Sequence, residues 1–294
     1  MNTARSNPSE SPGTIAHRVS RLRGGTWSDA SDVLTVEEPL EIRLLQEIDG
    51  AIARRSIAVT MRTPGHDFEL AAGFLFGESI VGGREDIFDI SYCTDEDEPQ
   101  AQNIVNVTLR PGVTFDTTRL ERNFYTTSSC GICGKATLES LEVHGCSALA
   151  LGFSVPAAVI QELPSKLRAA QPVFDRTGGL HAAGLFDRDG NLVVSREDVG
   201  RHNALDKLVG AQLLDGHVPL SHGILMLSGR ASFELLQKSL AAGISVVAAV
   251  GAPSSLAVGL AASFNITLLG FVRDDGFNVY TAPTRIAHAP APSR

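Results

Sequence analysis

The stretch from Ser239 to Val272 contains no charged residue, and it limits the possible folds more than any other feature. An unbroken run of about 20 apolar residues could span a membrane. This run is broken by small and polar residues at Gly251, Pro253, Ser254, Ser255 and Asn265. Its ends are rich in β-branched residues and its middle in alanine and leucine, which predicts a buried strand, a helix and a second buried strand. We therefore expect a soluble core and no membrane span.

The flanking segments extend this pattern into an α/β unit. Strands are predicted at residues 179–187 and 192–198, joined by a hairpin turn at Asp189-Gly190. Helices and strands then alternate as far as residue 272. A hairpin followed by repeated strand–helix units predicts a mixed sheet between layers of helices. Ligands of such sheets bind at the carboxyl ends of the strands, where helix N-termini offer free N–H groups.

Two strand-to-helix corners could contribute to such a ligand site. Small residues there would let a ligand approach the backbone, and hydroxyl groups could bind phosphate. Serine is also a preferred helix N-cap whatever the function, so simple capping is the alternative interpretation. The corner residues are Ser228, Gly229, Arg230 and Ser232 in the first, and Gly251, Ser254 and Ser255 in the second.

The N-terminal half predicts a smaller α+β unit. Its strands are expected at residues 40–45, 47–63, 86–93 and 102–110, with a helix at residues 66–80. The overall class is therefore α/β, or α+β when both units are counted. Two domains also fit the length, because 294 residues exceed a typical domain of about 100 to 200.

The N-terminus predicts a disordered tail on a cytoplasmic protein. Residues 1–25 are rich in Ser, Pro, Gly and Arg and include no apolar segment typical of a secretory signal. The predicted divisions are a disordered tail at 1–34, a small α+β domain at 35–120, a CxxC loop or linker at 121–145, an α/β domain at 146–286 and a second disordered tail at 287–294. The net charge of −8 argues against a nucleic acid as the main partner, because such binding needs many Lys and Arg contacts to phosphate.

Cys130 and Cys133 form a Cys-Gly-Ile-Cys motif that could serve a metal, a disulfide or a carried sulfur atom. Structural zinc sites use a second pair of ligands, and the chain has no second CxxC. Its histidines occur singly, and only His217 and His222 lie within five residues of each other. Zinc deaminases need H-x-E before P-C-x-x-C, and no H-x-E occurs here. The following Gly-Lys also fails the phosphate-loop pattern, because Ser129 and Ala136 replace its required residues. We therefore expect no metal site.

Thiol chemistry remains for this motif. A nearby cation, Lys135, and a predicted helix start both favour the thiolate form of a cysteine. The intervening and following glycines suit a loop that reaches between partners, which favours a sulfur carrier modestly over a disulfide exchanger. The other two cysteines, Cys93 and Cys146, are expected to be buried as small apolar residues.

Several sequence blocks together resemble the FdhD family, the sulfur carriers required for active formate dehydrogenase. The resemblance covers roughly residues 35 to 285. It rests on the blocks ELAAGFLFGESIV, SSCGICG, GGLHAAGLF, VSREDVGRHNALDKLVG, LSGRASFELLQKSLAAG, SSLAVGLA and ITLLGFVRDDGFNVYT. It implies a C-terminal domain with a cytidine-deaminase-like, three-layer mixed sheet.

The resemblance also implies a sulfurtransferase. A cysteine desulfurase would pass sulfur to Cys130 as a persulfide, with Cys133 auxiliary, and the sulfur would go to the bis-(molybdopterin guanine dinucleotide) molybdenum cofactor as bound substrate. Formate dehydrogenase and a second copy of the chain are further implied partners. The implied cofactor contacts are Phe271, Val272, Arg273, Asp274, Asp275 and Gly276.

Alternatives stay open at this stage. A polar block could form a second part of the site or a solvated helix face with internal ion pairs; its residues are Glu197, Asp198, Arg201, His202, Asn203 and Lys207. Two competing functions are a chaperone that binds the cofactor without catalysis and a zinc-dependent hydrolase.

Overall fold

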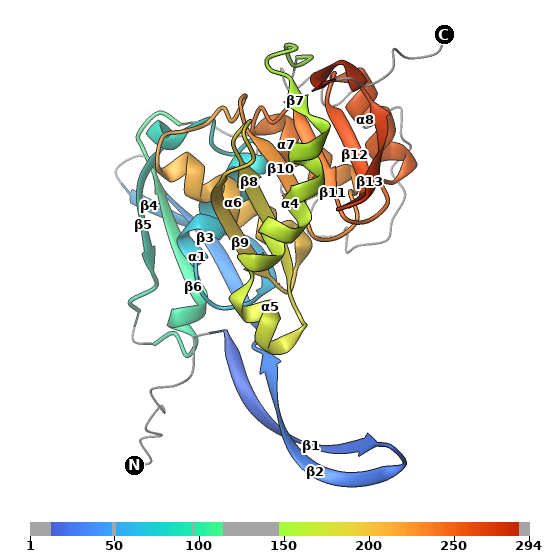
Figure 1. Ribbon diagram of the computed structural model, residues 1–294. Coiled ribbons are helices and arrows are strands. Elements are labelled where there is room, and N and C mark those ends of the chain that lie inside the picture. The colour runs from blue at the N-terminus through green and yellow to red at the C-terminus, as the bar shows by residue number, and fades with distance from the viewer. Residues whose placement is uncertain (1–12, 49–50, 96, 114–146, 288–294) are drawn as a thin grey trace.

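A computed structural model describes residues 13–48, 51–95, 97–113 and 147–287 of the chain. Its larger unit is a six-stranded mixed sheet in the order β13-β12-β11-β10-β8-β9 (Figure 1). Strands β10, β11 and β12 run parallel, and β8, β9 and β13 are each antiparallel to a neighbour. The strands are β8 His181–Phe186, β9 Leu192–Asp198, β10 Ile224–Leu227, β11 Val246–Ala249, β12 Thr267–Arg273 and β13 Gly276–Thr281.

Helices cover both faces of this sheet. Helix α4 (Ala157–Ala169) packs its apolar face, which includes Ile160, Leu163 and Leu167, on one side. On the other side lie α6 (Arg201–Leu214), α7 (Phe233–Ala241) and α8 (Ser255–Ser263). The short helix α5 (Pro172–Thr177) follows α4. The charge-free segment is thus β11, α8 and β12 of a buried core, and the described residues include no helix long and apolar enough to cross a membrane.

The smaller unit is a four-stranded sheet in the order β4-β3-β6-β5, backed by helix α1 (Asp67–Gly77). Its strands are β3 Glu38–Ile48, β4 Ala51–Arg62, β5 Ile87–Tyr92 and β6 Ile104–Leu109. The remaining short elements are η1 Arg84–Asp86, η2 Ala101–Asn103, β7 Val155–Pro156, η3 Pro283–Arg285 and β14 Ile286–Ala287, with β7 paired to β14. The expected α/β class, α+β overall with a larger three-layer C-terminal sheet, is confirmed.

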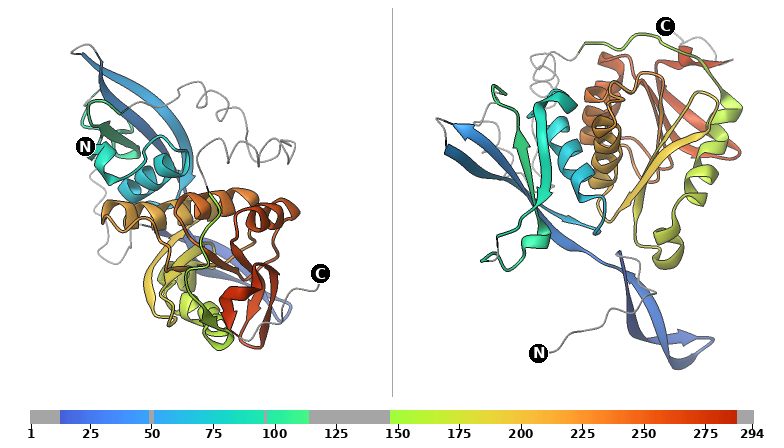
Figure 2. Two further views of the ribbon diagram at one scale, coloured as in Figure 1. Left: turned by 90° about the horizontal axis from the view of Figure 1, so that it is seen from above. Right: turned by 90° about the vertical axis from the view of Figure 1, so that its left-hand side faces the viewer.

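The two units meet where α1 packs on α6, so that both helices lie between the two sheets (Figure 2, right). Gly73 of α1 and Gly210 of α6 make this approach possible. A Cβ atom added to Gly73 would lie 1.9 Å from the carbonyl oxygen of Asp206, and one added to Gly210 would lie 1.8 Å from that of Glu69. One hydrophobic cluster runs through both units, from Leu40 and Val107 to residues of β10 and β11.

Partly buried polar contacts reinforce this junction. The Arg196 guanidinium of β9 donates two hydrogen bonds to the Glu69 carboxylate of α1. Burial works to raise the pKa of Glu69, but hydrogen bonds from Arg196 and His66 outweigh it and lower this pKa to about 2. The carboxylate is therefore charged at neutral pH, and the pair links α1 to the larger sheet.

Residues 14–35 differ from the disordered tail predicted for residues 1–34. They form a β-hairpin of β1 (Thr14–Arg23) and β2 (Thr26–Thr35). The turn residues Gly24 and Gly25 have φ of 56° and 82°, which two-residue hairpin turns favour and which glycine adopts without strain. The prediction was wrong here because the mean composition of the segment hid this Gly-Gly turn and the apolar residues on either side of it.

Candidate functional site

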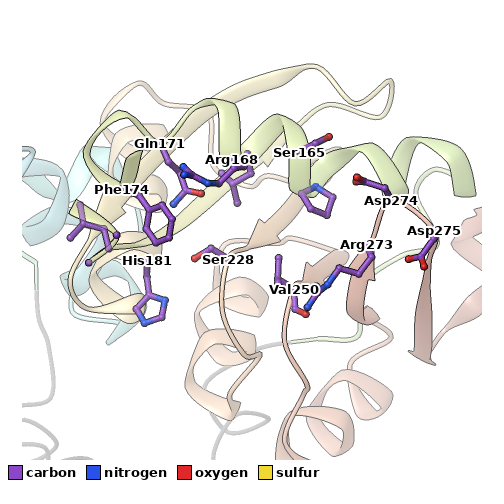
Figure 3. A pocket seen from close by; sticks show the side chains of 15 residues that line it. Ser165, Arg168, Gln171, Phe174, His181, Ser228, Val250, Arg273, Asp274 and Asp275 are labelled. Carbon is purple, nitrogen blue, oxygen red and sulfur yellow. The ribbon is translucent and has the colours of Figure 1, made fainter. Parts of the chain in front are cut away.

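A cavity of about 900 Å³ opens at the carboxyl ends of the parallel strands (Figure 3). Ser228 follows β10, Val250 follows β11, and Arg273 ends β12. The cavity lies where a ligand site is expected in this type of sheet, and the cavity volume suits a nucleotide-sized ligand. The lining residues are Pro164, Ser165, Leu167, Arg168, Gln171, Phe174, Gly178, Gly179, Leu180, His181, Ser228, Val250, Arg273, Asp274 and Asp275.

One end of the cavity is the β12–β13 turn. Three of the six implied cofactor contacts, Arg273, Asp274 and Asp275, line it, whereas Phe271 and Gly276 are outside the lining and Val272 is buried in the core beneath. The Arg273 guanidinium donates to the carbonyl oxygens of Val250 at 2.8 Å and Val272 at 2.7 Å. These bonds hold a fixed positive charge beside two carboxylates, so this end can present both an anion-binding group and hydrogen-bond acceptors.

The opposite end combines an aromatic ring, an amide and an imidazole (Figure 3). The Arg168 guanidinium lies over the Phe174 ring, 4.4 Å from its centroid, and the Gln171 side chain is nearly fully buried. His181 starts β8, and its pKa is lowered by burial and by the charges of Arg201 and His202. A neutral imidazole can both donate and accept a hydrogen bond, and a flat ring such as Phe174 can stack on a base or pterin.

Glu197 positions this aromatic end from outside. Its carboxylate accepts hydrogen bonds from the backbone N–H groups of Val173 at 3.1 Å and Phe174 at 2.9 Å, in the first turn of α5. These are the free N–H groups that a helix start leaves unsatisfied. Burial raises the pKa of Glu197 despite these bonds. Glu197 therefore fixes Phe174 through its helix without lining the cavity.

Most of the other polar residues in the 197–207 block join the two units. Lys207 bonds the buried Asp198 carboxylate at 2.7 Å and the carbonyl oxygen of Thr63 at 2.8 Å. Asp198 also accepts from the backbone N–H of Thr63, and Asn203 donates to the carbonyl of Met61. These side chains face β4 and the loop after it. The ion pair expected by the alternative interpretation is present, but Asp198, Asn203 and Lys207 are buried between the units and do not form a solvated face.

Arg201 and His202 lie at the start of α6, near the first residues of α7. The His202 imidazole contacts Ser232 Oγ at 3.2 Å and the Glu234 carboxylate at 2.9 Å. Ser232 is the N-cap residue of α7, but its side chain makes no capping bond. Of the two strand-to-helix corners, the first supplies Ser228 to the cavity, where Ser228 Oγ accepts from Ala182 N–H at 2.8 Å. In the second corner, Ser254 caps α8 through Ala257 N–H, as the alternative interpretation proposed.

Of the four cysteines, one lies within the described residues. Cys93 is buried, as predicted. Cys130, Cys133 and Cys146 lie outside the described residues. Among the residues that the structure describes, no group of three His, Cys, Asp or Glu side chains is arranged to hold a metal ion.

The sequence profile described as the FdhD/NarQ family matches residues 35–287. The chain belongs to the FdhD/NarQ family. It is 51% identical over 276 residues to the sulfur carrier protein FdhD of Mycolicibacterium paratuberculosis, covering 93% of this chain and 98% of that protein. It is also 51% identical to the sulfur carrier protein FdhD of Streptomyces coelicolor over 278 residues, with 93% and 96% covered. The resemblance inferred from the sequence blocks is confirmed.

A solved structure extends the comparison to the fold of FdhD/NarQ proteins. The crystal structure of a putative formate dehydrogenase accessory protein from Desulfotalea psychrophila matches with a TM-score of 0.72 at 27% identity. The match covers 94% of this chain and 100% of that one. The architecture around the cavity thus belongs to an FdhD/NarQ fold.

Sequence reasoning assigned no role to Phe174, Gln171, Arg168 and His181, which build the aromatic end of the cavity in this FdhD/NarQ protein. Helices α4 and α5 were not predicted, so the first three residues had no place in the expected sheet. A signal was present for α4, because Ile160, Leu163 and Leu167 recur at helical spacing. His181 lies near the start of the strand predicted at residues 179–187. A polar residue at the end of a buried strand is a signal that could have marked it as a site residue.

Proposed function

We propose that this protein is a sulfur carrier that takes sulfur from a cysteine desulfurase as a persulfide on Cys130. It then delivers the sulfur to the bis-(molybdopterin guanine dinucleotide) molybdenum cofactor, which formate dehydrogenase requires. The names of the FdhD relatives support the sulfur-carrier part, and the name of the Desulfotalea psychrophila neighbour supports the link to formate dehydrogenase. The partners in this proposal are the desulfurase, formate dehydrogenase and a second copy of the chain, all in the cytoplasm.

The cavity at the carboxyl ends of the parallel strands supports the cofactor part of the proposal. Its volume of about 900 Å³ is near the upper end of the usual range for small-molecule sites, as a bulky dinucleotide would need. Its two ends differ in chemistry: Phe174 can stack on a planar ring, while Arg273 can pair with a phosphate. The carboxylates of Asp274 and Asp275 can accept hydrogen bonds from the N–H groups of guanine, and phosphates are expected to lie away from them.

Loading of sulfur onto Cys130 needs no external oxidant or reductant. The Cys130 thiolate attacks the outer sulfur of the desulfurase persulfide, so that a new S–S bond forms as the old one breaks and the desulfurase thiolate leaves. Cys133 is the auxiliary thiol. Its attack on the inner sulfur of the Cys130 persulfide would release hydrosulfide and leave a Cys130–Cys133 disulfide, which a later thiol must reduce.

The persulfide can be tested directly by mass spectrometry. Incubation with a cysteine desulfurase and cysteine is expected to add one sulfur mass to the peptide that contains Cys130, and treatment with a reducing thiol should remove it. The buried Cys93 serves as an internal control and should gain nothing. A mass gain only on Cys93 or Cys146 would contradict the proposal.

The cofactor site can be tested separately with guanosine diphosphate as a probe of one arm of the dinucleotide. We expect Arg273→Ala to weaken its binding about tenfold in calorimetric titration, because one charge-assisted contact to phosphate is lost. Arg188→Ala is the matched control, since Arg188 lies in the exposed β8–β9 turn away from the cavity lining. Equal affinities of the two variants for guanosine diphosphate would show that Arg273 does not bind the probe.

A chaperone that binds the cofactor without carrying sulfur is the second candidate. The cavity supports this candidate as well, because binding of the cofactor by the described lining residues needs no thiol. The two candidates differ in whether Cys130 is necessary.

A further inference from the structure

The aromatic end of the cavity contains a buried amide without a hydrogen-bond partner. Gln171 lines the cavity and is only 4% exposed. Its side-chain amide makes no hydrogen bond to any residue in the described part of the chain. Burying an amide in this way destabilises a protein, and buried amides are nearly always paired. The free donor and acceptor of Gln171 therefore point to a ligand in the cavity (Figure 3).

The local fold gives this amide no task of its own. Gln171 is the N-cap residue of α5, and an N-cap side chain usually accepts hydrogen bonds from the first N–H groups of its helix. Here Pro172 has no N–H, and Glu197 already accepts from the N–H groups of Val173 and Phe174. Because Glu197 satisfies the helix start, the Gln171 amide is left available to the cavity.

The groups beside Gln171 are aromatic or carry balanced charge. The Arg168 guanidinium lies over the Phe174 ring, 4.4 Å from its centroid, and the Asp175 carboxylate pairs with this guanidinium. The positive charge over the ring is therefore balanced. The His181 imidazole is neutral at pH 7, because its pKa is lowered by burial and by neighbouring cations. This end offers a flat ring and hydrogen-bonding groups without net charge.

The β12–β13 turn forms the charged end of the same cavity (Figure 3). Arg273 can pair with a phosphate there, beside the carboxylates of Asp274 and Asp275. Molybdopterin guanine dinucleotide carries a guanine nucleotide at one end and a pterin, which bears no charge, at the other. The charged end of the cavity therefore suits the nucleotide, and the aromatic end suits the pterin.

We propose that the aromatic end binds the pterin of the cofactor, with the pterin stacked on Phe174 and its lactam edge bonded to the Gln171 amide. The lactam edge is a ring N–H beside a carbonyl. The Gln171 carbonyl accepts from this N–H, and the Gln171 NH₂ donates to the ring carbonyl. The inference rests on the proposed function and assigns the two halves of its cofactor to the two ends of the cavity. Guanine has the same lactam edge, so a pterin and a guanine nucleotide serve as separate probes.

The first test is equilibrium dialysis of the full chain against 6-hydroxymethylpterin, which is quantified by its own fluorescence. Gln171→Leu is expected to weaken pterin binding about tenfold or more, because two hydrogen bonds are lost from a buried site. Gln212→Leu is the matched control, since Gln212 is also buried, at 7% exposed, but lies on α6 outside the cavity lining. Failure of wild-type protein to bind the pterin would overturn the proposal, as would equal binding by Gln171→Leu and Gln212→Leu.

A change in the ligand tests the contact with the lactam edge. The N3-methyl derivative of the same pterin lacks the ring N–H. Wild-type protein should prefer the unmethylated pterin about tenfold, and Gln171→Leu should lose this preference, because the two changes remove the same interaction. A preference of the same size in both proteins would show that Gln171 does not contact this edge.

Guanosine diphosphate as the second probe separates the two ends of the cavity. Gln171→Leu should weaken binding of the pterin more than binding of guanosine diphosphate, and Arg273→Ala should do the reverse. The two probes should also bind to wild-type protein at the same time. Displacement of the pterin by guanosine diphosphate would place guanine at the aromatic end and overturn the proposal.

Thermal unfolding distinguishes a ligand-binding amide from a structural one. Gln171→Leu should melt at the same temperature as wild-type protein or higher, because an unpartnered buried amide is replaced by an apolar side chain of similar size. A lower melting temperature would show that the amide supports the fold. None of these results affects the mass gain expected on Cys130 or the role of Arg273 in binding guanosine diphosphate. Failure of the pterin site and failure of the proposed function are therefore distinguishable.

Discussion

Formate dehydrogenase is expected to stay inactive in cells whose only copy of this protein carries Cys130→Ala. In the proposed function the Cys130 thiolate forms the bond to the incoming sulfur, and alanine has no atom that can replace it. The loss should therefore be complete, to the level of cells that lack the protein. The measurement is formate oxidation in extracts, with immunoblots to show that the variant and the dehydrogenase accumulate normally.

Two further variants make this result specific. Cys93→Ala is the matched control, because Cys93 is a buried residue of the smaller unit, and it should retain activation at permissive temperature. Cys133→Ala should reduce activation less than Cys130→Ala, in line with an auxiliary role. Full activation by Cys130→Ala would exclude a necessary persulfide there and favour the cofactor-binding chaperone.

Gly73→Ala is expected to destabilise the fold strongly, as is Gly210→Ala. No other added methyl group at the junction of the units should cost as much stability. The added Cβ would lie 1.9 Å from a backbone carbonyl oxygen, and no side-chain rotation can relieve that contact. Helices α1 and α6 would have to separate and lose packing along their length. We expect a loss of about 3 kcal/mol or more, which corresponds to a fall in melting temperature of about 6 to 12 °C for a chain of this size.

Gly259 supplies the control for this prediction. It lies in the middle of α8, and an added Cβ there would meet no atom within 4 Å. Gly259→Ala should therefore stabilise the protein by about 0.5 to 1 kcal/mol through higher helix propensity. Thermal unfolding by differential scanning calorimetry compares the two. Similar melting temperatures for Gly73→Ala and Gly259→Ala would show that the helix crossing is looser than described.

The sequence predicted those strands of the fold that helices close to them in the chain cover on both faces. Strands β10, β11 and β12 were found because continuous β-branched and apolar runs are typical of strands covered on both faces. Strand β13 was not predicted, because Gly276–Thr281 is mixed in polarity and its pairing with β12 depends on a turn rather than on a hydrophobic pattern.

The site was predictable only in part for a different physical reason. Asp198 and Lys207 form a buried ion pair within the larger unit, and both also hydrogen-bond to Thr63 of the smaller unit. In the sequence such residues look the same as ligand-binding groups. Phe174 has its place because Glu197 holds the start of a six-residue helix, and so short a helix leaves no periodic pattern. The family resemblance identified the β12–β13 turn, and local patterns alone would not have done so.

The junction of α1 with α6 also has a consequence for how the gene could be divided. The contacts that join the units, including Gly73 with Gly210, Glu69 with Arg196 and Thr63 with Lys207, are all non-covalent and bring together residues far apart in the chain. A polypeptide encoded as two pieces, broken between Val113 and Ser147, would keep every one of them. Co-expressed halves should therefore find each other and reassemble, whereas either half alone would expose an apolar helix face.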